Sequence, residues 1–212
     1  MHLLHREELT SSLHSGDPDS LFIEPILDED CQIGATTIDL RLGYDFLVSI
    51  MTRRPSVDLS YDDHSYRRIG SHFQETRRDL GDSFVLYPNQ IVLSTTLEYI
   101  ALPRDVFADV ATRSSFNRLG IQVANSLQPG YRGCASLELC NHGHTPIELV
   151  VGSRIVQARF YRLPNEHEYL RQGLPRKYLA NVRPLVAQTD GDEELERLAD
   201  IRERRDAAGE HS

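Results

Sequence analysis

DVATRSSFNRLGIQVANSLQPGYRGCASLELCN, residues 109–141, alternates β-prone segments with two polar turns. A basic, hydroxyl-rich turn surrounds Ser114, a Gly- and Pro-rich turn spans residues 128–133, and Glu138 interrupts an otherwise apolar strand. Val, Ile and Leu runs cut by Gly and Pro are typical of short β-strands. The stretch predicts a β scaffold that gathers its polar groups at turns.

The chain on both sides of this stretch continues the β pattern. Residues 36–42 (TTIDLRL) alternate apolar and polar positions, and the runs at 83–112 and 147–161 are rich in Val, Ile, Tyr and Phe. Many short strands separated by turn residues indicate an all-β barrel or jelly roll. The predicted fold class is therefore mainly β, a distorted barrel or jelly roll, with a short helix over 3–14 and a C-terminal arm after Leu163.

Other segments carry weaker signals. Residues 51–82 are polar and without a sustained period, so we expect an excursion with one short strand near 57–59. Residues 114–119 predict a single helical turn. We expect one domain over 1–187 and a charged, helical or disordered tail over 188–212.

Composition limits the classes of function. The 212 residues have a net charge of −9, and more than half of it lies in the tail, which argues against duplex nucleic acid as the main ligand. No segment is apolar and long enough to predict a membrane span. The three cysteines lack CxxC spacing and are expected to be reduced thiols, as in a cytoplasmic protein.

The basic turn offers donors for an anion. Ser114 and Ser115 stand between Arg113 and Arg118, and guanidinium and hydroxyl groups together suit phosphate oxygens. The alternative is a solvated polar turn.

Glu138 is an acid with apolar neighbours on both sides. Leu137 and Leu139 point to the opposite face of a strand from Glu138. The carboxylate either faces solvent or acts as a general base whose pKa is tuned by partial burial and a nearby Arg.

Familiar metal and nucleotide motifs are missing from the sequence. His167 lies in the run EHEY, which bears a partial likeness to the H-x-E of zinc deaminases, but that signature also needs a P-C-x-x-C segment, and no CxxC occurs. GxGxxG and Walker A patterns are absent as well. No protein metal ligands are therefore predicted.

Several segments, in order, resemble the dCTP deaminase branch of the dCTP deaminase/dUTPase superfamily. They are ATTIDLRLG (35–43), VLYPNQIVLSTTLEYIALP (85–103), TRSSFNRLGI (112–121), QPGYRG (128–133), LELCNHG (137–143), VGSRIVQARFYRL (151–163) and PRKYLANVRP (175–184). No single motif is decisive, but the ordered set, over about residues 20–184, is specific.

The resemblance implies a homotrimer with active sites between subunits, acting on a deoxynucleoside triphosphate that carries Mg²⁺, without zinc. Glu138 would activate water for attack on C4 of cytosine, supported by Arg118 and Ser114. The implied substrate-binding residues are Arg113, Ser115, Gln128, Tyr131, Gln157, Tyr169, Lys177, Tyr178 and Asn181. The expected product of dCTP is dUTP, with ammonia released.

Two departures from the family pattern concern the substrate. Gln128 replaces an acid that serves dUTPases as the base for attack on the α-phosphate, so a dUTPase or bifunctional activity is disfavoured. The segment between Gly120 and Gln128, expected to form a hairpin at the base and sugar, is short. Asn181 stands where the family often has Gln. The alternatives are a nucleotide-binding regulator without turnover and a β module whose 188–212 tail recruits a partner.

Overall fold

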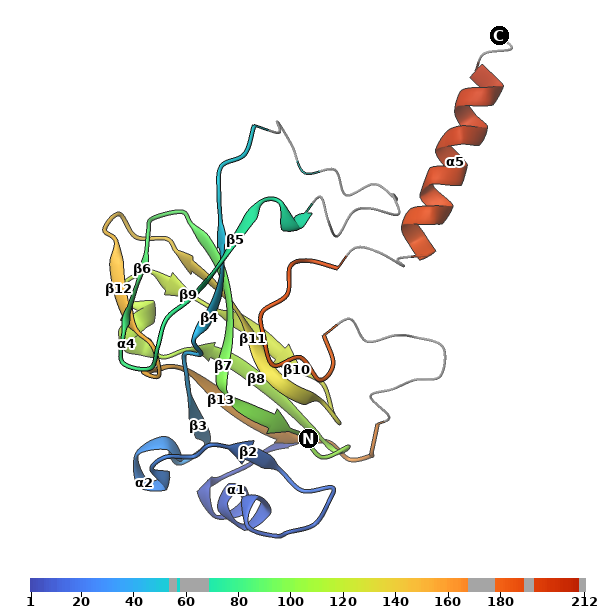
Figure 1. Cartoon of the computed structure of the whole chain (residues 1–212). Coiled ribbons are helices and arrows are strands. Elements are labelled where there is room, and N and C mark those ends of the chain that lie inside the picture. Colours follow the sequence, from blue (N-terminus) through green and yellow to red (C-terminus); the bar gives the residue numbers. More distant parts are fainter. Residues whose placement is uncertain (54–56, 58–68, 168–177, 189–192, 210–212) are drawn as a thin grey trace. The chain divides into compact units, whose positions relative to one another are not determined.

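The computed structural model describes residues 1–53, 57, 69–167, 178–188 and 193–209 (Figure 1). The chain divides into two compact units. The first combines Met1–Val48 with Glu75–Pro184, and the second combines Ser49–Gln74 with Leu185–Ser212. The predicted strand near 57–59 falls largely outside the described residues, and the boundary predicted at 187/188 stays a prediction.

Short strands make up most of the described chain. They are β1 (His2–Leu3), β2 (Phe22–Glu24), β3 (Thr37–Arg41), β4 (Asp45–Ser49), β5 (Phe73–Arg77), β6 (Ser83–Leu86), β7 (Ile91–Ala101), β8 (Val106–Thr112), β9 (Ile121–Gln122), β10 (Ala124–Leu127), β11 (Arg132–Asn141), β12 (Ile147–Val150) and β13 (Arg154–Arg162). The helices are α1 (Arg6–Leu13), α2 (Glu29–Gln32), α4 (Ser114–Asn117) and α5 (Glu193–Gly209).

Within the described ranges these strands form three sheets. The first has the order β1-β13-β8-β10, with β3 also paired to β13, and the second has the order β5-β4-β7-β11-β9, with β2 also paired to β7. The third pairs β12 with β6. The prediction of a distorted jelly-roll β fold with a short N-terminal helix is confirmed, but the sheets do not close into a true barrel.

The alternation read from the sequence decides which face of each strand enters the core. In β3, Ile38 and Leu40 are fully buried while Asp39 between them is half-buried, and β11 buries Leu137 and Leu139 on either side of the exposed Glu138. Phe46 of β4 stacks on Phe84 of β6 with ring centroids 4.2 Å apart. These apolar faces, removed from water, supply the main stabilisation of the fold.

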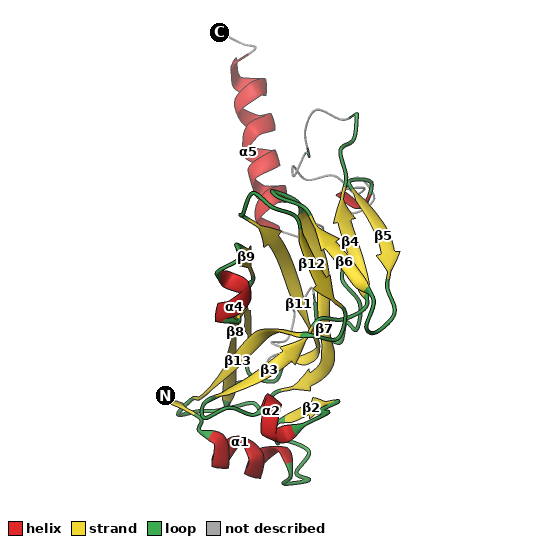
Figure 2. Cartoon of the chain, turned by 90° about the vertical axis from the view of Figure 1, so that its left-hand side faces the viewer, coloured by secondary structure: helices red, strands yellow, loops and turns green. Residues whose placement is uncertain are grey.

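The first unit places two helices at one end of its strands (Figure 2). Helix α1 begins with a capping box, in which the His5 side chain accepts from the Glu8 amide and the Glu8 carboxylate accepts from the His5 amide. Asp28 caps α2 by accepting from the amide of Cys31 at 3.0 Å. The predicted helix over 3–14 is thus observed in shorter form, whereas α2 was not predicted.

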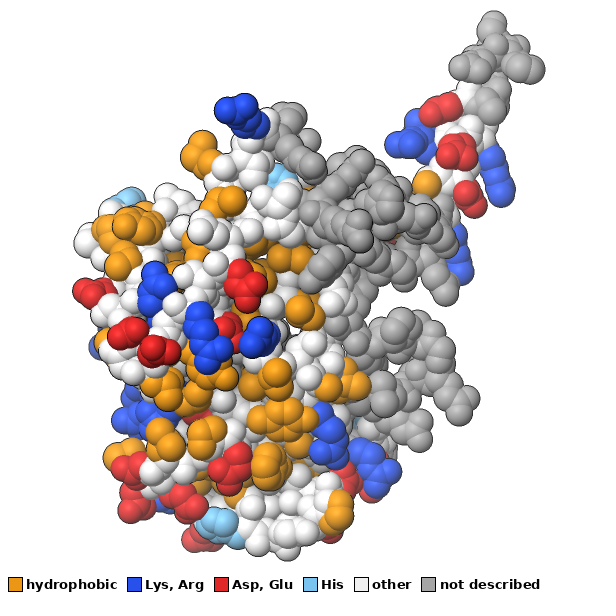
Figure 3. Space-filling view, viewed as in Figure 1, with side chains coloured by type: hydrophobic (Ala, Val, Ile, Leu, Met, Phe, Trp, Pro, Cys, Tyr) orange, Lys and Arg blue, Asp and Glu red, His pale blue; other side chains and the backbone are white. Residues whose placement is uncertain are grey.

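The second unit contains α5, which carries both acidic and basic side chains along its length (Figure 3). Leu198 and Ile201 are exposed on it. The helical alternative for the tail is the one observed. Among the described residues, none of the helices combines the length and hydrophobicity needed to cross a bilayer.

Candidate active site on β11 and the turn after β8

Helix α4 is a single turn that follows β8, as the sequence predicts. The carbonyl of Arg113 accepts hydrogen bonds from the amides of Phe116 and Asn117, both at 3.0 Å, and the carbonyl of Ser114 accepts from Arg118 at 3.1 Å. Ser114, Ser115 and Arg118 are exposed. The turn therefore presents two hydroxyl groups and one guanidinium to the surface.

Arg113 differs from its neighbours because its guanidinium is already engaged. Its Nε lies 3.1 Å from Oδ2 of Asp39 on β3, and one terminal nitrogen donates to the carbonyl of Arg154 on β13 at 2.9 Å. Arg154 also approaches Asp39, at 3.5 Å. Burial raises the pKa of the Asp39 carboxyl, and Arg113 and Arg154 oppose that rise by attraction. The assignment of Arg113 to phosphates stays a prediction.

Glu138 projects from the face of β11 opposite to the buried Leu137 and Leu139. Its side chain is exposed in the single chain, but the protein atoms around it still raise its pKa by desolvation. Within the described residues, no other side chain forms a hydrogen bond or ion pair with this carboxylate. A raised pKa and an accessible position together suit a group that takes up and releases protons during a reaction.

The two parts of the candidate site are linked through β9. Helix α4 packs against β9, and β9 pairs with the end of β11, where Gln122 stands opposite Cys140. Cys140 is two residues from Glu138, so both side chains leave the same face of β11. Within one chain, Glu138 forms no hydrogen bond or ion pair with Ser114 or Arg118, all three of which are described.

The segment expected to be a hairpin is not one. β9 pairs with β11 in one sheet, whereas β10 pairs with β8 in the other. Between them, Val123 is buried and exchanges hydrogen bonds with Thr112: its amide donates to the Thr112 hydroxyl at 2.7 Å. Residues 121–127 therefore cross from one sheet to the other.

Asn125 on β10 contacts the strand that carries Glu138, and the sequence did not single it out. Its amide nitrogen donates to the carbonyl of Ser136 at 2.8 Å, two residues before Glu138, and its side-chain oxygen accepts from the Ser126 amide at 2.7 Å. The polar run Ala-Asn-Ser inside a strand was the available signal. Asn125 therefore links β10 to β11, the strand that carries Glu138, by a side-chain hydrogen bond.

The two predicted substrate-binding residues of the Gly- and Pro-rich turn, Gln128 and Tyr131, differ in their exposure to solvent. Gln128 is exposed, and its carbonyl accepts from the Tyr131 amide at 3.0 Å. Tyr131 is buried, and its hydroxyl donates to the carbonyl of Cys134 at 2.8 Å. Tyr131 thus supports the turn from inside, and its contact with substrate stays a prediction.

The outer face of the first sheet carries Gln157. In β13 it stands opposite Asp39 of β3 on one side and Ala111 of β8 on the other, so these three side chains share one face. The side chain of Gln157 is half-buried there.

The C-terminal arm lies along the start of β11. The amide of Ala180 donates to the carbonyl of Arg132 at 2.7 Å, and the carbonyl of Asn181 accepts from the Cys134 amide at 2.8 Å. Tyr178 is partly exposed at 37%. Tyr169 and Lys177 lie outside the described residues. The arm therefore reaches the same strand as Glu138.

Gly133 lets the arm approach this closely. Its φ is +141°, and a Cβ there would lie 2.8 Å from the Asn181 carbonyl oxygen. Gly133→Ala should therefore destabilise the protein by about 1–3 kcal/mol and release the arm, seen as faster hydrogen exchange at residues 178–184. Gly16→Ala is the matched control, because Gly16 also has a positive φ but open space around it. Equal exchange of the arm in the two variants would contradict this role.

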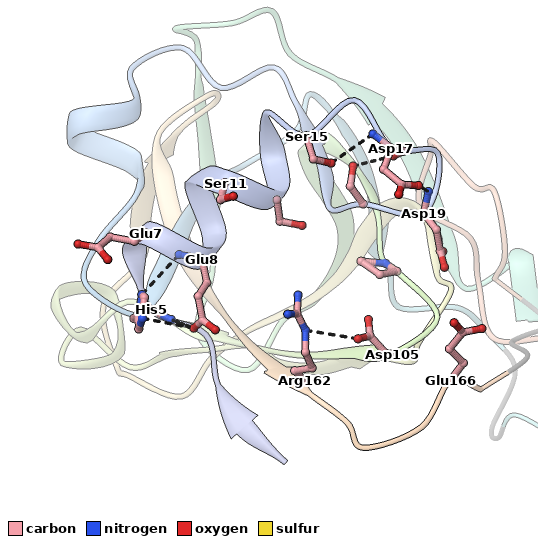
Figure 4. Close-up of a pocket in the computed structure, with 13 residues that line it drawn as sticks. His5, Glu7, Glu8, Ser11, Ser15, Asp17, Asp19, Asp105, Arg162 and Glu166 are labelled. Carbon is pink, nitrogen blue, oxygen red and sulfur yellow. Dashed lines mark hydrogen bonds and ion pairs between the residues drawn. The ribbon is translucent and has the colours of Figure 1, made fainter.

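A separate cavity of about 650 Å³ opens beside α1, and none of the predicted site residues lines it (Figure 4). Its polar groups are largely engaged with one another: Arg162 lies 3.3 Å from Asp105, and the Asp19 amide donates to Asp17 at 2.8 Å. The described residues also bring together no group of three or more His, Cys, Asp or Glu side chains that could hold a metal ion. The three cysteines, all of them described, form no disulfide with one another, and their reduced state stays a prediction.

Comparisons of the sequence with known proteins give a family and several relatives. The sequence model of a family described as dCTP deaminase-like matches residues 3–163. A dCTP deaminase of Haloarcula marismortui is 36% identical over 200 residues, which cover 91% of this chain and 97% of the relative. A relative from Methanobrevibacter smithii named "dCTP deaminase, dUMP-forming" is 32% identical over 183 residues, covering 84% and 91%.

A solved structure shares the fold. The crystal structure of 2'-deoxycytidine 5'-triphosphate deaminase from Agrobacterium tumefaciens superposes with a TM-score of 0.55 at 28% identity. The match covers 74% of this chain and 47% of that one, so this chain spans about half of the crystallised protein.

Proposed function

Because this chain belongs to the dCTP deaminase-like family, we propose that it hydrolyses the C4–N bond of dCTP and releases dUTP and ammonia. The observation that carries the proposal is Glu138, an accessible carboxylate with a raised pKa on the outer face of β11. The family resemblance assigns the deaminase glutamate to this position.

Glu138 moves the protons of the reaction. Its carboxylate takes a proton from water while the water oxygen bonds to C4 of cytosine, and N3 is protonated as the ring double bond is lost. A proton then passes to the amino group, the C4–N bond breaks, and C4 becomes a carbonyl as ammonia leaves. One carboxylate acts first as base and then as acid, and the pKa of Glu138, raised by desolvation, favours the step in which it holds the proton.

Arg118 and Ser114 support this chemistry from α4. A guanidinium beside Glu138 keeps the carboxylate ionised and oriented, and the Ser114 hydroxyl hydrogen-bonds the water or the developing oxygen on C4. Both side chains are exposed and form no such contact with Glu138 within one chain. This favours a site completed between copies of the chain, as expected for a homotrimer.

The triphosphate enters as its Mg²⁺ complex, so the metal ion is part of the substrate. Mg²⁺ retains several waters and bridges phosphate oxygens, and it therefore asks few ligands of the protein. The exposed hydroxyl of Ser115, together with Lys177 and Tyr178 of the arm, is proposed to hold the phosphates. Gln128, Gln157 and Asn181 are proposed to contact the sugar and base.

The product is proposed to be dUTP rather than dUMP. Removal of pyrophosphate requires a base at the α-phosphate, and the amide of Gln128 cannot act as one. The relative from Methanobrevibacter smithii is named for dUMP formation, whereas the name of the one from Haloarcula marismortui states no product, so the product of this chain has to be measured.

The test is incubation of the purified protein with Mg²⁺ and each ribo- and deoxyribonucleoside triphosphate, followed by chromatography of the products. We expect dCTP to give dUTP and ammonia in equal amounts. Formation of dUMP and pyrophosphate would overturn the product assignment. Thermal stabilisation by a nucleotide with no product formed would instead favour the nucleotide-binding regulator. The motive for that alternative is the altered segment at residues 121–127, which crosses between the sheets.

A further inference from the structure

The pairing of β11 with β7 is interrupted just before Glu138. The first part of the ladder ends with Cys134 opposite Tyr99, and the second part begins with Ser136 opposite Thr95. The step is two positions on β11 (134 to 136) and four on β7 (99 to 95), so β7 carries two extra residues at this point. Such bulges occur next to active sites, where they redirect a strand and its side chains. This one determines which residue of β7 stands opposite Glu138.

The hydrophobic pattern of β11 does not distinguish the two registers. If the first register continued, Glu138 would stand opposite Thr95, whereas it stands opposite Leu93. A shift of two residues, about 7 Å along β7, leaves every side chain of β11 on its own face, because the period of a strand is two. Leu137 and Leu139 would point into the core in both cases. The place of Glu138 along β7 therefore depends on contacts other than this alternation.

The Thr96 hydroxyl bridges the two strands at the interruption. It accepts a hydrogen bond from the Ala135 amide at 2.9 Å and donates one to the Glu98 carbonyl at 2.8 Å. All three residues are buried, so water does not replace these bonds when they are lost. The hydroxyl thus takes the part of a direct bond between the backbones of β11 and β7, and it ties Ala135 to one position on β7.

Asn125 holds the next residue of β11 from β10. Its side-chain amide donates to the Ser136 carbonyl at 2.8 Å, and Ser136 is the residue at which the second register begins. Thr96 and Asn125 therefore hold two successive residues of β11, one through its amide and the other through its carbonyl. These residues lie three and two positions before Glu138.

We propose that Thr96 and Asn125 are positioning residues for Glu138: the hydroxyl and the amide fix the register of β11 at the interruption and thereby the place of the carboxylate at the substrate. Thr96 acts through β11 and not by contact with the nucleotide, because its side chain lies in the core. The catalytic consequence rests on the proposed function, whereas the effect on β11 is a property of the protein without substrate.

The first measurement is hydrogen exchange of the nucleotide-free protein at residues 135–139. Thr96→Val keeps the shape of the side chain and removes the hydroxyl, whereas Thr96→Ser keeps the hydroxyl. We expect exchange in this segment to quicken at least about fivefold in Thr96→Val and to stay close to the wild type in Thr96→Ser. Ser94→Ala is the matched control, because Ser94 is also buried on β7 but donates to the Asp45 carbonyl of β4 at 2.9 Å. It should leave residues 135–139 unchanged.

The second measurement is steady-state kinetics with dCTP. Thr96→Val and Asn125→Ala should each lower kcat by about 10- to 100-fold and change KM by less than about twofold, because the carboxylate is displaced while the substrate keeps its own contacts. Thr96→Ser should retain most of the wild-type kcat, and so should Ser94→Ala. If Thr96→Val does not fold, Asn125→Ala carries both measurements, because its side chain is only half-buried.

Several results would overturn the proposal. A raised KM with unchanged kcat would mean that these residues act through substrate binding. Equal losses of kcat in Thr96→Val and Ser94→Ala would mean that any weakening of the core lowers activity, and a Thr96→Ser variant as impaired as Thr96→Val would mean that the hydroxyl is not the cause. Unchanged exchange at 135–139 in Thr96→Val would show that the hydroxyl does not hold β11. Failure of the wild-type protein to deaminate dCTP would overturn the proposed function alone, and exchange would still decide whether Thr96 fixes β11.

Discussion

Glu138→Gln abolishes deamination while the protein keeps its fold and its affinity for dCTP: this is the expected result, with kcat lowered by about 10²- to 10⁴-fold. Glutamine has nearly the same shape as glutamate but cannot accept the proton of water. The side chain projects away from the core beside the buried Leu137 and Leu139, so its replacement creates no cavity. The measurements are kcat with dCTP and the shift in melting temperature caused by dCTP.

The control for this variant is Glu148→Gln, which changes another exposed glutamate on a strand, β12. It should leave kcat and dCTP binding as in the wild type. Deamination that survives Glu138→Gln at more than about a tenth of the wild-type rate would remove Glu138 from the mechanism. Loss of dCTP binding along with turnover would instead assign Glu138 to substrate recognition.

Local patterns in the sequence predicted the strands and the turn of the candidate site well. The alternation Leu137-Glu138-Leu139 fixed which side chain leaves the core, because a strand has a period of two whatever surrounds it. The polar run after β8 predicted the single turn of α4. These features depend on neighbours in the chain, so the sequence contains them directly.

The pairing of β9 and β10 could not be predicted in this way. Two short β-prone segments close in sequence suggest a hairpin, but Val123 between them is buried and takes its hydrogen bonds from Thr112. Gly120, with φ of +94° and Gly143 close against it, turns the chain toward β11 first. Long-range pairing with β11 and β8 therefore prevailed over the local preference for a hairpin.

The engagement of Arg113 was hidden for a related reason. In the sequence it is one of two arginines that flank two serines, and nothing local separates it from Arg118. Asp39, 74 positions earlier, is the residue that distinguishes them. An ion pair between strands far apart in sequence leaves no local signal, so only the fold shows that Arg113 is paired with Asp39 while Arg118 is exposed.

Glu98 provides the second large expected effect, a dependence of stability on pH. It is fully buried, and desolvation raises its pKa from 4.5 to about 7, although hydrogen bonds from the Arg41 amide at 2.8 Å and the Gln32 side chain at 3.3 Å oppose the rise. The folded state then binds this proton more tightly than the unfolded state does. The resulting stability is fully present below pH 4.5 and is lost as the pH rises to about 7, a loss of about 3 kcal/mol.

Urea denaturation at pH values from 4.5 to 8 measures this effect, with Glu98→Gln as the variant that cannot titrate. The free energy of unfolding of the wild type relative to the variant should fall by about 3 kcal/mol between the two ends of the range. Comparing differences at each pH removes any fixed cost of the substitution. If the free energies of unfolding of the wild type and of Glu98→Gln change in parallel with pH, the hydrogen bonds from Arg41 and Gln32 offset the desolvation and keep Glu98 ionised throughout. The Gln32 side-chain amide would then donate to a permanently charged carboxylate across this pH range, while it also donates to the Asp39 carbonyl.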